Sequence, residues 1–306
     1  MSYLKQKNNP LFSVIVANFN NGRFLAEMIH SVKNQTYTNW ELVIADDCST
    51  DNSLDILNEF EQDQRIKVVT LSKNTGAGNT FRTAINHASG DIVGMLGADD
   101  ALQTNALEQM VCAHTEHPSV SLITSLSIGC SATMAPLGPY TYTRLLNPGE
   151  ELIHHPFVGS FATFKRSAYD KTLGFDAQLK RAVDRDIYLK LDEVGPLFGL
   201  NEYLYFYRLH DGGISQGESG TKAYRSAILA TCAAYHRRKE TGKANISKAQ
   251  YMNLMTSWFL QEAFLLRWVQ KTACNRLLFK GFMHSPKILF RRDYWSIFAR
   301  NNFIGL

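Results

Sequence analysis

Long apolar runs and paired cysteines are both missing from this 306-residue chain. No stretch of 18 consecutive apolar residues occurs, so we expect no membrane-spanning helix. The first ten residues, MSYLKQKNNP, are polar and lack the apolar core of a signal peptide. The five cysteines are scattered without a CxxC spacing, which argues against structural zinc and favours a reduced, cytosolic compartment.

Acidic residues are scarce in the last part of the chain. Residues 221–306 hold 15 basic side chains and three acidic ones, a net charge of +12, whereas residues 1–220 hold 17 basic and 25 acidic ones, a net of −8. Hydrophobic residues at 45% exclude a disordered chain. We therefore expect two folded regions, 1–220 and 221–306, and a partner for the basic region such as a membrane surface or a nucleic acid.

The first hundred residues contain a regular alternation of two periods. Short runs rich in β-branched residues predict four buried strands, at residues 12–17, 40–45, 66–71 and 91–96. Amphipathic stretches between them predict helices, the second of which would be capped by Thr50 or Asp51. This order predicts βαβ units, and hence an α/β fold with a mostly parallel sheet flanked by helices.

Beyond residue 118 the pattern is less regular. We predict further strands at 119–126, 155–164 and 203–209, a helix at 187–195 and a loop at 129–150, which is rich in glycine, proline and threonine. From about residue 222 a helical period continues to the end of the sequence. Residues 221–306 are thus predicted to form a helical appendage.

Polar or glycine residues follow each of the first four predicted strands. In parallel sheets ligands bind beyond the carboxyl ends of the strands, so these residues are the first candidates for a functional site. They are Asn18 and Asn20, Asp46 and Asp47, Asn74 and Gly76, and Asp99 and Asp100.

Five stretches resemble, in order and spacing, the inverting nucleotide-sugar glycosyltransferases of family 2, whose fold is called GT-A. They are SVIVANFN (13–20), SVKNQTYTNWELVIADDCSTDNS (31–53), NHASGDIVGMLGADD (86–100), GFDAQLKRAVDRD (174–186) and YRLH (207–210). The resemblance falls within residues 10–215. It implies a GT-A (Rossmann-like) catalytic domain at residues 1–220, a nucleotide-sugar donor, and Mg²⁺ or Mn²⁺ as cofactor.

The resemblance implies donor-binding roles for residues at several strand ends. Asp46 and Asp47 match an acidic pair that reads the base, with Asp47 as the closer contact; capping of the following helix is the alternative. Arg82 either approaches the donor or covers the helix surface. The other implied positions are Ala17 (where the family has proline), Asn18, Phe19, Asn20, Asn74, Gly76, Ala98 and Asp99.

The stretch LGADD (96–100) matches the metal-binding motif of the family. Asp99 aligns with the motif's final aspartate, whereas Gly97 stands at its first. The resemblance implies Asp99, Asp100 and His210 as metal ligands; capping of the next turn is the alternative for Asp100, and a contact with the diphosphate is the alternative for His210. Arg208 would contact either the donor diphosphate or an aspartate of the active site. A metal held there would neutralise charge on the departing diphosphate.

Asp184 matches the general base of the family's acceptor-side motif. Inversion needs one in-line displacement, in which a base takes the proton of the acceptor hydroxyl. Val183 replaces the acid that usually precedes this aspartate. Asp186 is the second candidate for the catalytic base, with a carboxylate favoured by the helix dipole as its alternative interpretation.

The basic region 221–306 lies outside these motifs. It carries the clusters Arg237–Lys239 and Arg291–Arg292 and three tryptophans, Trp258, Trp268 and Trp295. Aromatic and basic residues on helices suit the surface of an anionic bilayer. A helical subdomain that packs on the catalytic domain, or that forms a homodimer, is an equal alternative.

These features predict a metal-dependent inverting glycosyltransferase. It would move a sugar from a UDP- or dTDP-sugar to a surface-polysaccharide or lipid-linked saccharide acceptor, in the cytoplasm or at the inner face of the plasma membrane. Gly97 and Val183 motivate a second hypothesis, a non-catalytic nucleotide-sugar-binding or scaffold protein with the same fold. Binding of nucleic acid through the basic region is a third, but no motif supports it, so we expect no nucleic-acid partner.

Overall fold

The computed structural model describes residues 9–141, 143–147, 150–154, 160–213, 217–242, 247–266 and 271–302. By their internal contacts, the residues divide into two compact units, Met1–Ala227 and Ile228–Leu306. The division falls inside helix α7 (Gly217–Glu240). Each unit contains a hydrophobic core cluster of its own.

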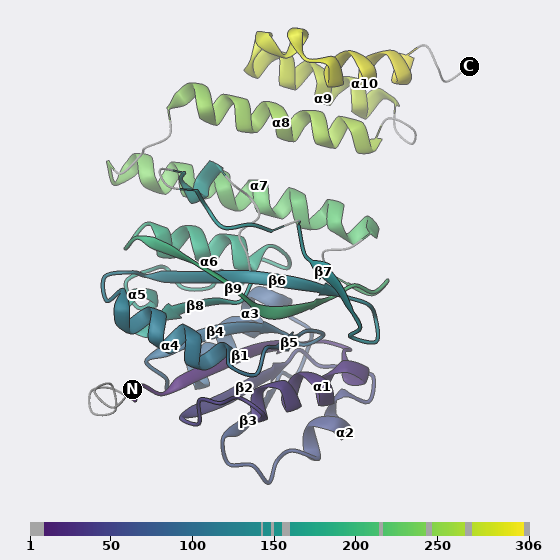
Figure 1. Ribbon diagram of the computed structural model, residues 1–306. Helices are drawn as coiled ribbons and strands as arrows, with labels where there is room; N and C mark the ends of the chain where they lie inside the picture. The colour runs from purple at the N-terminus through teal and green to yellow at the C-terminus, as the bar shows by residue number, and fades with distance from the viewer. Residues whose placement is uncertain are drawn as a thin grey trace. The chain divides into compact units, whose positions relative to one another are not determined.

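The first four strands form the parallel half of one mixed sheet in the first unit. They are β1 (Phe12–Asn18), β2 (Trp40–Asp46), β3 (Ile66–Thr70) and β4 (Ile92–Gly97). They lie side by side in the order β3-β2-β1-β4, and all three pairings are parallel. Helices α1 (Gly22–Lys33), α2 (Ser53–Asn58) and α3 (Ala77–His87) alternate with them, which confirms the predicted α/β fold (Figure 1).

Five later strands extend the sheet beyond β4. β8 (Ala162–Lys165) pairs antiparallel with β4 and with β6 (Leu122–Cys130), and β9 (Leu197–Arg208) runs parallel to β6. The short strands β5 (Ala101–Leu102) and β7 (Pro136–Pro139) pair with β9 and β6. Helices α4 (Ala106–Glu116), α5 (Arg166–Tyr169) and α6 (Val183–Asp192) and the 3-10 turn η1 (Leu152–His154) complete this part.

Two predicted elements of this half differ in the structure. β7 lies inside the predicted loop 129–150, where it pairs with the end of β6. β9 begins at Leu197 rather than at residue 203, because its first residues pair with Leu122 and Ile123 of β6. Of the predicted strand 155–164, residues 155–159 lie outside the described part of the chain.

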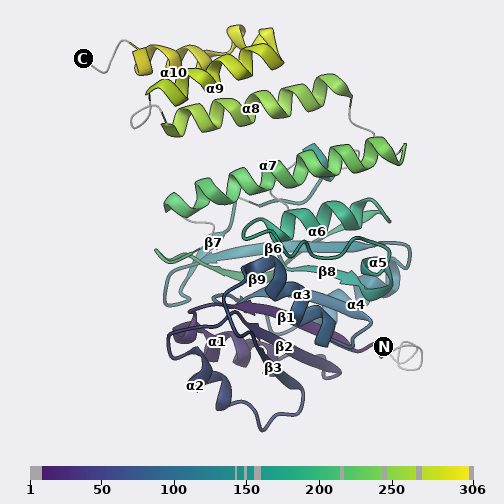
Figure 2. The same ribbon diagram turned by 180° about the vertical axis from the view of Figure 1, so that it is seen from behind.

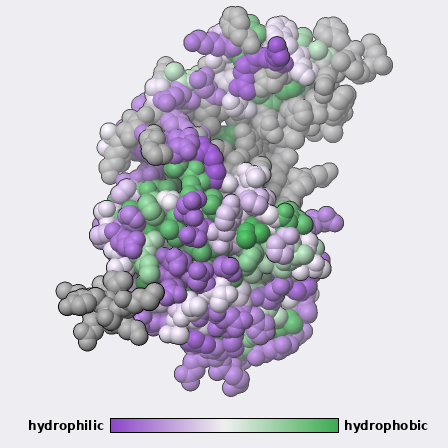
Figure 3. Space-filling view, in the orientation of Figure 1, coloured by the Kyte–Doolittle hydropathy of each residue, from purple (hydrophilic) through white to green (hydrophobic). Residues whose placement is uncertain are grey.

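Strands β1, β2 and β4 are mostly apolar because both faces of the sheet are covered there, whereas the edge strand β3 is only partly buried, with Lys67 and Thr70 exposed. Val14 and Val16 of β1 belong to the core cluster that includes Leu25 and Ile29 of α1, while Ile15 between them is fully buried on the other face. The two views show α1 and α4 on one face and α3 on the opposite face (Figures 1 and 2). Hydrophilic residues dominate the surface around α2 and β3 (Figure 3).

The prediction that Thr50 or Asp51 caps α2 is partly right. Asn52 occupies the cap position without a capping bond through its side chain, but Asp51 Oδ1 accepts the N–H of Ser53, the first helical residue, at 3.0 Å. Asp51 also accepts a hydrogen bond from the Gly22 backbone N–H at 2.9 Å, and the Thr50 N–H donates to Asn20 Oδ1 at 2.8 Å. These side chains therefore join the β2–α2 loop to the β1–α1 loop.

The second unit is helical throughout its described residues. After the end of α7 it contains α8 (Lys248–Leu266), α9 (Lys271–His284), the 3-10 turn η2 (Pro286–Phe290) and α10 (Arg292–Asn302). Among the residues described, no helix combines the length and apolar character needed to cross a membrane. Trp268 and the side chain of Trp258 lie outside what the structure describes. The core cluster consists of Leu260, Ala263, Cys274, Leu278, Ile288, Tyr294 and Ile297.

Candidate active site

A cavity of about 480 Å³ lies at the carboxyl ends of β1 and β4. The strand register brings these ends together, since Ala17 pairs with Ala45 of β2 on one side and with Gly97 of β4 on the other. The cavity is lined by the ends of β1 and β4, by β9, by the start of α3, by the start of α6 and by Gly212–Gly213. Segments far apart in the sequence thus converge at the predicted edge of the sheet.

The acidic pair after β2 is buried and hydrogen-bonded within the protein. Asp46 accepts hydrogen bonds from Asn18 Nδ2 at 2.7 Å and from the Ser49 N–H at 2.8 Å. Asp47 accepts from the backbone N–H groups of Thr75 at 2.7 Å and Gly76 at 2.8 Å. Neither carboxylate lines the cavity. In the structure both carboxylates hold neighbouring loops in place. The contact between Asp47 and the base of the donor nucleotide stays a prediction.

The other predicted donor-binding residues divide into two groups. Ala17, Phe19, Asn20 and Ala98 line the cavity, and Phe19 is 43% exposed there. Four others do not line the cavity. Asn18 is fully buried beside Asp46, and the Lys180 side chain covers Gly76. Asn74 and Arg82 are exposed on the surface outside the cavity. Ala77, which belongs to the stretch 74–78 that resembles a donor-binding loop of the family, lines the cavity as well, and so does Phe81, which no motif marked.

Asp99 and His210 form a pair at the cavity. Asp99 Oδ2 lies 2.9 Å from His210 Nε2, and His210 Nδ1 lies 3.4 Å from Arg23 Nη2. The His210 ring also packs on Phe24, with 4.7 Å between ring centroids. Within the described residues no three His, Cys, Asp or Glu side chains form a preassembled metal site. One carboxylate and one imidazole do fit a cation that completes its shell with phosphate oxygens and water.

Asp100 is directed into the protein. Its Oδ1 accepts the Arg208 backbone N–H at 2.8 Å and its Oδ2 accepts the Tyr205 hydroxyl at 2.6 Å. Burial, and after it the charge of Asp99, raises the pKa of Asp100 well above its usual range. Because both carboxylate oxygens serve the fold, this geometry favours a loop-fixing role for Asp100 over the expected metal contact.

Arg208 holds the Asp99–Asp100 loop in place from inside the protein. It is 2% exposed, and its guanidinium donates to the carbonyl of Asp99 at 2.6 Å, to the carbonyl of Ala132 at 2.7 Å and to Glu27 Oε2 at 2.6 Å. Its guanidinium also lies over the Phe24 ring at 4.5 Å. Arg208 does not line the cavity, so the geometry favours a positioning role over the expected diphosphate contact.

Gly97, which stands where the family pattern has an aspartate, is closely surrounded. A Cβ at this position would lie 2.5 Å from Asp100 Oδ2 and 3.1 Å from the Tyr205 hydroxyl. The Gly97 N–H donates to that hydroxyl at 3.0 Å. Tyr205 therefore joins Gly97 to Asp100. Sequence reasoning missed Tyr205, because it lies in an aromatic strand with no motif to mark it.

The two carboxylates predicted as bases have different environments at the start of α6. Asp184 follows Ala182, which has a left-handed φ of 53°, and its side chain opens into the cavity. The Asp184 side chain is exposed at the cavity, yet the protein packed around the cavity desolvates its carboxylate and raises the pKa of Asp184. Asp186 is buried away from the cavity in an ion pair with Lys190 Nζ at 2.6 Å. The geometry favours Asp184 as the base and a structural role for Asp186.

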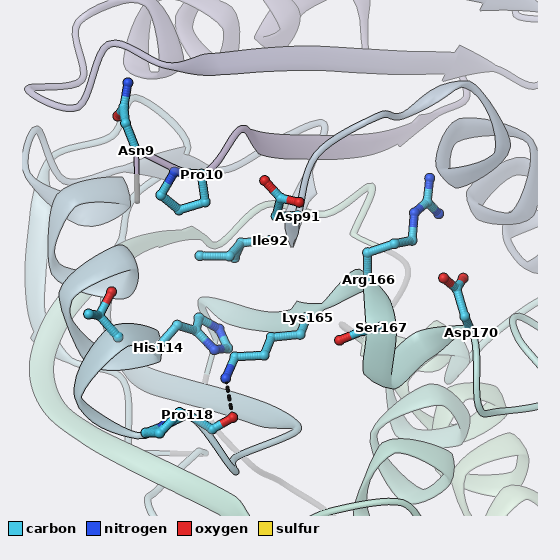
Figure 4. Close-up of a pocket in the computed structure, with 11 residues that line it drawn as sticks. Asn9, Pro10, Asp91, Ile92, His114, Pro118, Lys165, Arg166, Ser167 and Asp170 are labelled. Carbon is cyan, nitrogen blue, oxygen red and sulfur yellow. Dashed lines mark hydrogen bonds between the residues drawn. The ribbon is translucent and has the colours of Figure 1, made fainter. Parts of the chain in front are cut away.

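A second cleft, of about 680 Å³, lies at the amino end of β4 (Figure 4). Its charged groups hold the fold together: Lys165 donates to the Pro118 carbonyl, Arg166 to the carbonyls of Ile85 and Ala88, and Asp91 accepts the Leu11 N–H at 3.2 Å. None of the predicted site residues lines this cleft. We therefore place the candidate active site in the smaller cavity.

Comparison with known proteins identifies the family of the chain. The family model described as "Glycosyl transferase family 2" matches residues 13–173, which is more than half of the chain. The chain therefore belongs to glycosyl transferase family 2 and is a glycosyltransferase with the GT-A fold.

Individual relatives show how far the similarity extends. The chain is 31% identical over 207 residues to a chondroitin synthase of Escherichia coli, covering 67% of this chain but only 30% of that protein. It is 28% identical over 211 residues to the putative teichuronic acid biosynthesis glycosyltransferase TuaG of Bacillus subtilis, covering 68% and 83%. Residues 1–349 of TarS from S. aureus, solved with UDP-GlcNAc, superpose with a TM-score of 0.70 at 17% identity, over 95% of this chain and 88% of that one.

Proposed function

We propose that the protein is a metal-dependent, inverting glycosyltransferase that uses a UDP- or dTDP-sugar. The observation that carries the proposal is that Asp184 and Asp99 line one cavity on the carboxyl edge of the sheet, and that His210 contacts Asp99 from outside the cavity lining. The solved complex of TarS with UDP-GlcNAc supports a nucleotide-sugar donor. The names of the chondroitin synthase and of TuaG support a polysaccharide or a lipid-linked saccharide as acceptor.

Asp184 acts as the general base in a single displacement. Its carboxylate takes the proton of the acceptor hydroxyl while that oxygen forms a bond to the anomeric carbon. The bond from the anomeric carbon to the phosphate oxygen breaks on the opposite face, and the nucleoside diphosphate leaves with the bonding electrons. A raised pKa suits this role, because a more basic carboxylate accepts the proton more readily near neutral pH.

Asp99 and His210 would hold the Mg²⁺ or Mn²⁺. When bound, the cation supplies positive charge next to the departing diphosphate. Tyr205 and Arg208 keep the loop of Asp99 in place through the hydrogen bonds to Asp100 and to the Asp99 carbonyl. Asp100 contributes to metal binding indirectly, because it accepts the hydrogen bonds that fix this loop.

A non-catalytic binding protein is the competing hypothesis, since Gly97 and Val183 depart from the family pattern. The structure gives Gly97 a packing reason, because Asp100 and Tyr205 fill the space a side chain would need. Asp184 remains at the cavity despite Val183, which is buried at the first turn of α6. These two observations favour the enzyme.

The central experiment measures UDP or dTDP release from a panel of nucleotide sugars with a saccharide acceptor. We expect Asp184→Asn and Asp99→Ala each to lower transfer about 10²- to 10⁴-fold, because one removes the base and the other a metal ligand. Removal of divalent cations with EDTA should have a similar effect. Asp170→Asn, which changes an exposed carboxylate outside the cavity, is the control. Full transfer by both active-site variants would rule out this mechanism.

The second unit would bring the enzyme to an anionic membrane that carries its acceptor. One side of α9 exposes Phe279 (60%) and Met283 (63%), one turn apart, next to the exposed basic residues Arg276 and Lys280. Apolar side chains flanked by basic ones are typical of helices that lie at a bilayer surface. Packing on the first unit, or a homodimer, is the competing interpretation of this basic region.

A further inference from the structure

Two basic residues line the active-site cavity without an ion-pair partner among the described residues. They are Lys180, which is exposed, and Arg181, which is half-buried, and both precede α6. The same cavity is lined by the acidic residues Asp99 and Asp184, and by Asp100, whose carboxylate is directed into the protein. Asp99 pairs with His210 and Asp100 bonds to Tyr205 and Arg208, so the existing contacts leave the charges of Lys180 and Arg181 uncompensated.

The backbone before these two residues is fixed to the loop after β3. The Gly78 N–H donates to the Leu179 carbonyl at 2.8 Å, and a Cβ at Gly78 would overlap the carbonyl oxygen of Asp176. Only a residue without a side chain allows this close approach. The two segments are therefore held in one register.

The same loop also connects Lys180 to Asp47. A Cβ at Gly76 would lie 3.1 Å from Cγ of Lys180, so the Lys180 side chain passes directly over the glycine. The Gly76 N–H donates to Asp47 at 2.8 Å. The backbone that leads into the two basic residues, and the stem of the Lys180 side chain, are thus held by contacts that exist before any ligand binds, which lowers the entropic cost of using these residues.

The cavity needs positive charge if a nucleoside diphosphate enters it. Arg208, which the family resemblance implied for this purpose, is buried and directs its guanidinium to Asp99, Ala132 and Glu27. Asp99 and Asp184, which also line the cavity, offer the phosphates no positive charge. Lys180 and Arg181 are the basic side chains that line the cavity in the described part of the chain.

We propose that Lys180 and Arg181 bind the diphosphate of the donor. This assignment rests on the proposed function and specifies its donor site. The planar guanidinium of Arg181 can donate two parallel hydrogen bonds to phosphate oxygens, whereas Lys180 supplies a compact charge. When the bond between the sugar and the phosphate oxygen breaks, the leaving diphosphate gains negative charge, and both residues stabilise it. The stretch 180–184 thereby supplies both the general base, Asp184, and the positive charges that stabilise the leaving diphosphate.

The test is calorimetric binding of UDP and dTDP to the full-length protein in EDTA, which removes the contribution of a metal. We expect Lys180→Met and Arg181→Gln each to weaken binding of the diphosphate by about tenfold or more, the usual effect of losing a charge-assisted hydrogen bond. Affinity for uridine or thymidine, measured by competition against the diphosphate, should stay within twofold. Arg181→Lys should fall between the wild type and Arg181→Gln.

Lys171→Met is the matched control, because Lys171 is exposed, lies in the same unit and does not line the cavity. The inference is overturned if the wild type binds UDP or dTDP and both variants bind it equally well. It is also overturned if the variants lose nucleoside and diphosphate affinity in parallel, since that result indicates a distorted base pocket. A wild type that binds neither diphosphate, either in EDTA or with Mn²⁺ added in excess, overturns the proposed function itself.

Discussion

Gly97 leaves space that a buried carboxylate and a tyrosine hydroxyl occupy. Asp100 Oδ2 and the Tyr205 hydroxyl both lie within reach of the missing Cβ, and the Gly97 N–H bonds to Tyr205. The aspartate that the family pattern has at this position would add a third carboxylate beside Asp99 and Asp100. Like charges in a buried site disfavour ionisation, so restoring the family residue would conflict with the present arrangement.

Gly97→Asp should therefore lower both stability and transfer. We expect a loss of about 1–3 kcal/mol in the free energy of unfolding, which is typical of overpacking a buried site, and a fall in kcat as the Asp99 loop shifts. Gly97→Ala should show a smaller loss. Urea unfolding and nucleotide-release assays measure both, with Gly129→Ala as the control because its new Cβ would have 3.5 Å to the nearest atom. A stable, more active Gly97→Asp enzyme would contradict this interpretation of the loop.

At the scale of elements, α4 attaches to the sheet through a buried histidine. His114 is 3% exposed, and its Nε2 lies 2.9 Å from Thr163 Oγ1 of β8. Its Nδ1 has no hydrogen-bond partner among the described residues. Burial, assisted by the nearby charge of Lys165, lowers the pKa of His114 from 6.5 to about 3. The contact between helix and strand therefore requires a neutral imidazole.

This requirement predicts acid lability of the first unit. Below pH 6.5 the unfolded chain binds a proton at His114, whereas the folded protein does not until about pH 3, so stability falls as the pH falls through this window. Between pH 7 and pH 5 the contribution of this residue should decrease by about 2 kcal/mol. His114→Gln can still bond to Thr163 but does not titrate. Urea unfolding at the two pH values should show a smaller loss for the variant; equal losses would exclude His114 as the cause.

At the scale of the whole molecule, the structure divides the chain between Ala227 and Ile228, whereas the sign of the net charge changes near residue 220. The basic clusters and the exposed side of α9 belong to the second unit, whose own core joins α8, α9, η2 and α10. Trp295, which is 50% exposed, donates its indole N–H to the Leu289 carbonyl at 2.6 Å, so its ring is held at the surface. A unit with fixed exposed apolar groups and many basic residues suits a peripheral membrane contact.

Vesicle sedimentation tests this contact. The wild type should bind vesicles with anionic lipid more strongly than neutral ones, and the double variant Phe279→Ser with Met283→Ser should bind about tenfold less, because it loses the apolar part of the contact. Leu229→Ser is the control, since Leu229 is similarly exposed (56%) but lies on α7. A wild type that does not bind anionic vesicles and that dimerises in sedimentation equilibrium would establish the homodimer interpretation instead.

The sequence by itself determined the parallel half of the sheet and the residues with which the search for a site begins. β1 to β4 could be predicted because each is a local apolar run between helical stripes, and the motifs around Asp99 and Asp184 are contiguous. The placement of β7, β8 and β9 depends on pairings between distant segments, such as Leu122 of β6 with Leu197 of β9. Such pairings leave little trace in a local pattern.

Only the tertiary structure decided what each polar group contacts. Asp100 bonds to Arg208, 108 residues away, and Arg208 in turn to Glu27, 181 residues away. Asp47 bonds to a loop that also positions Lys180, a residue to which no motif had assigned a role. A sequence shows which side chains can donate, accept or carry charge, but burial makes each of them satisfy a partner that only the folded chain brings within 3 Å.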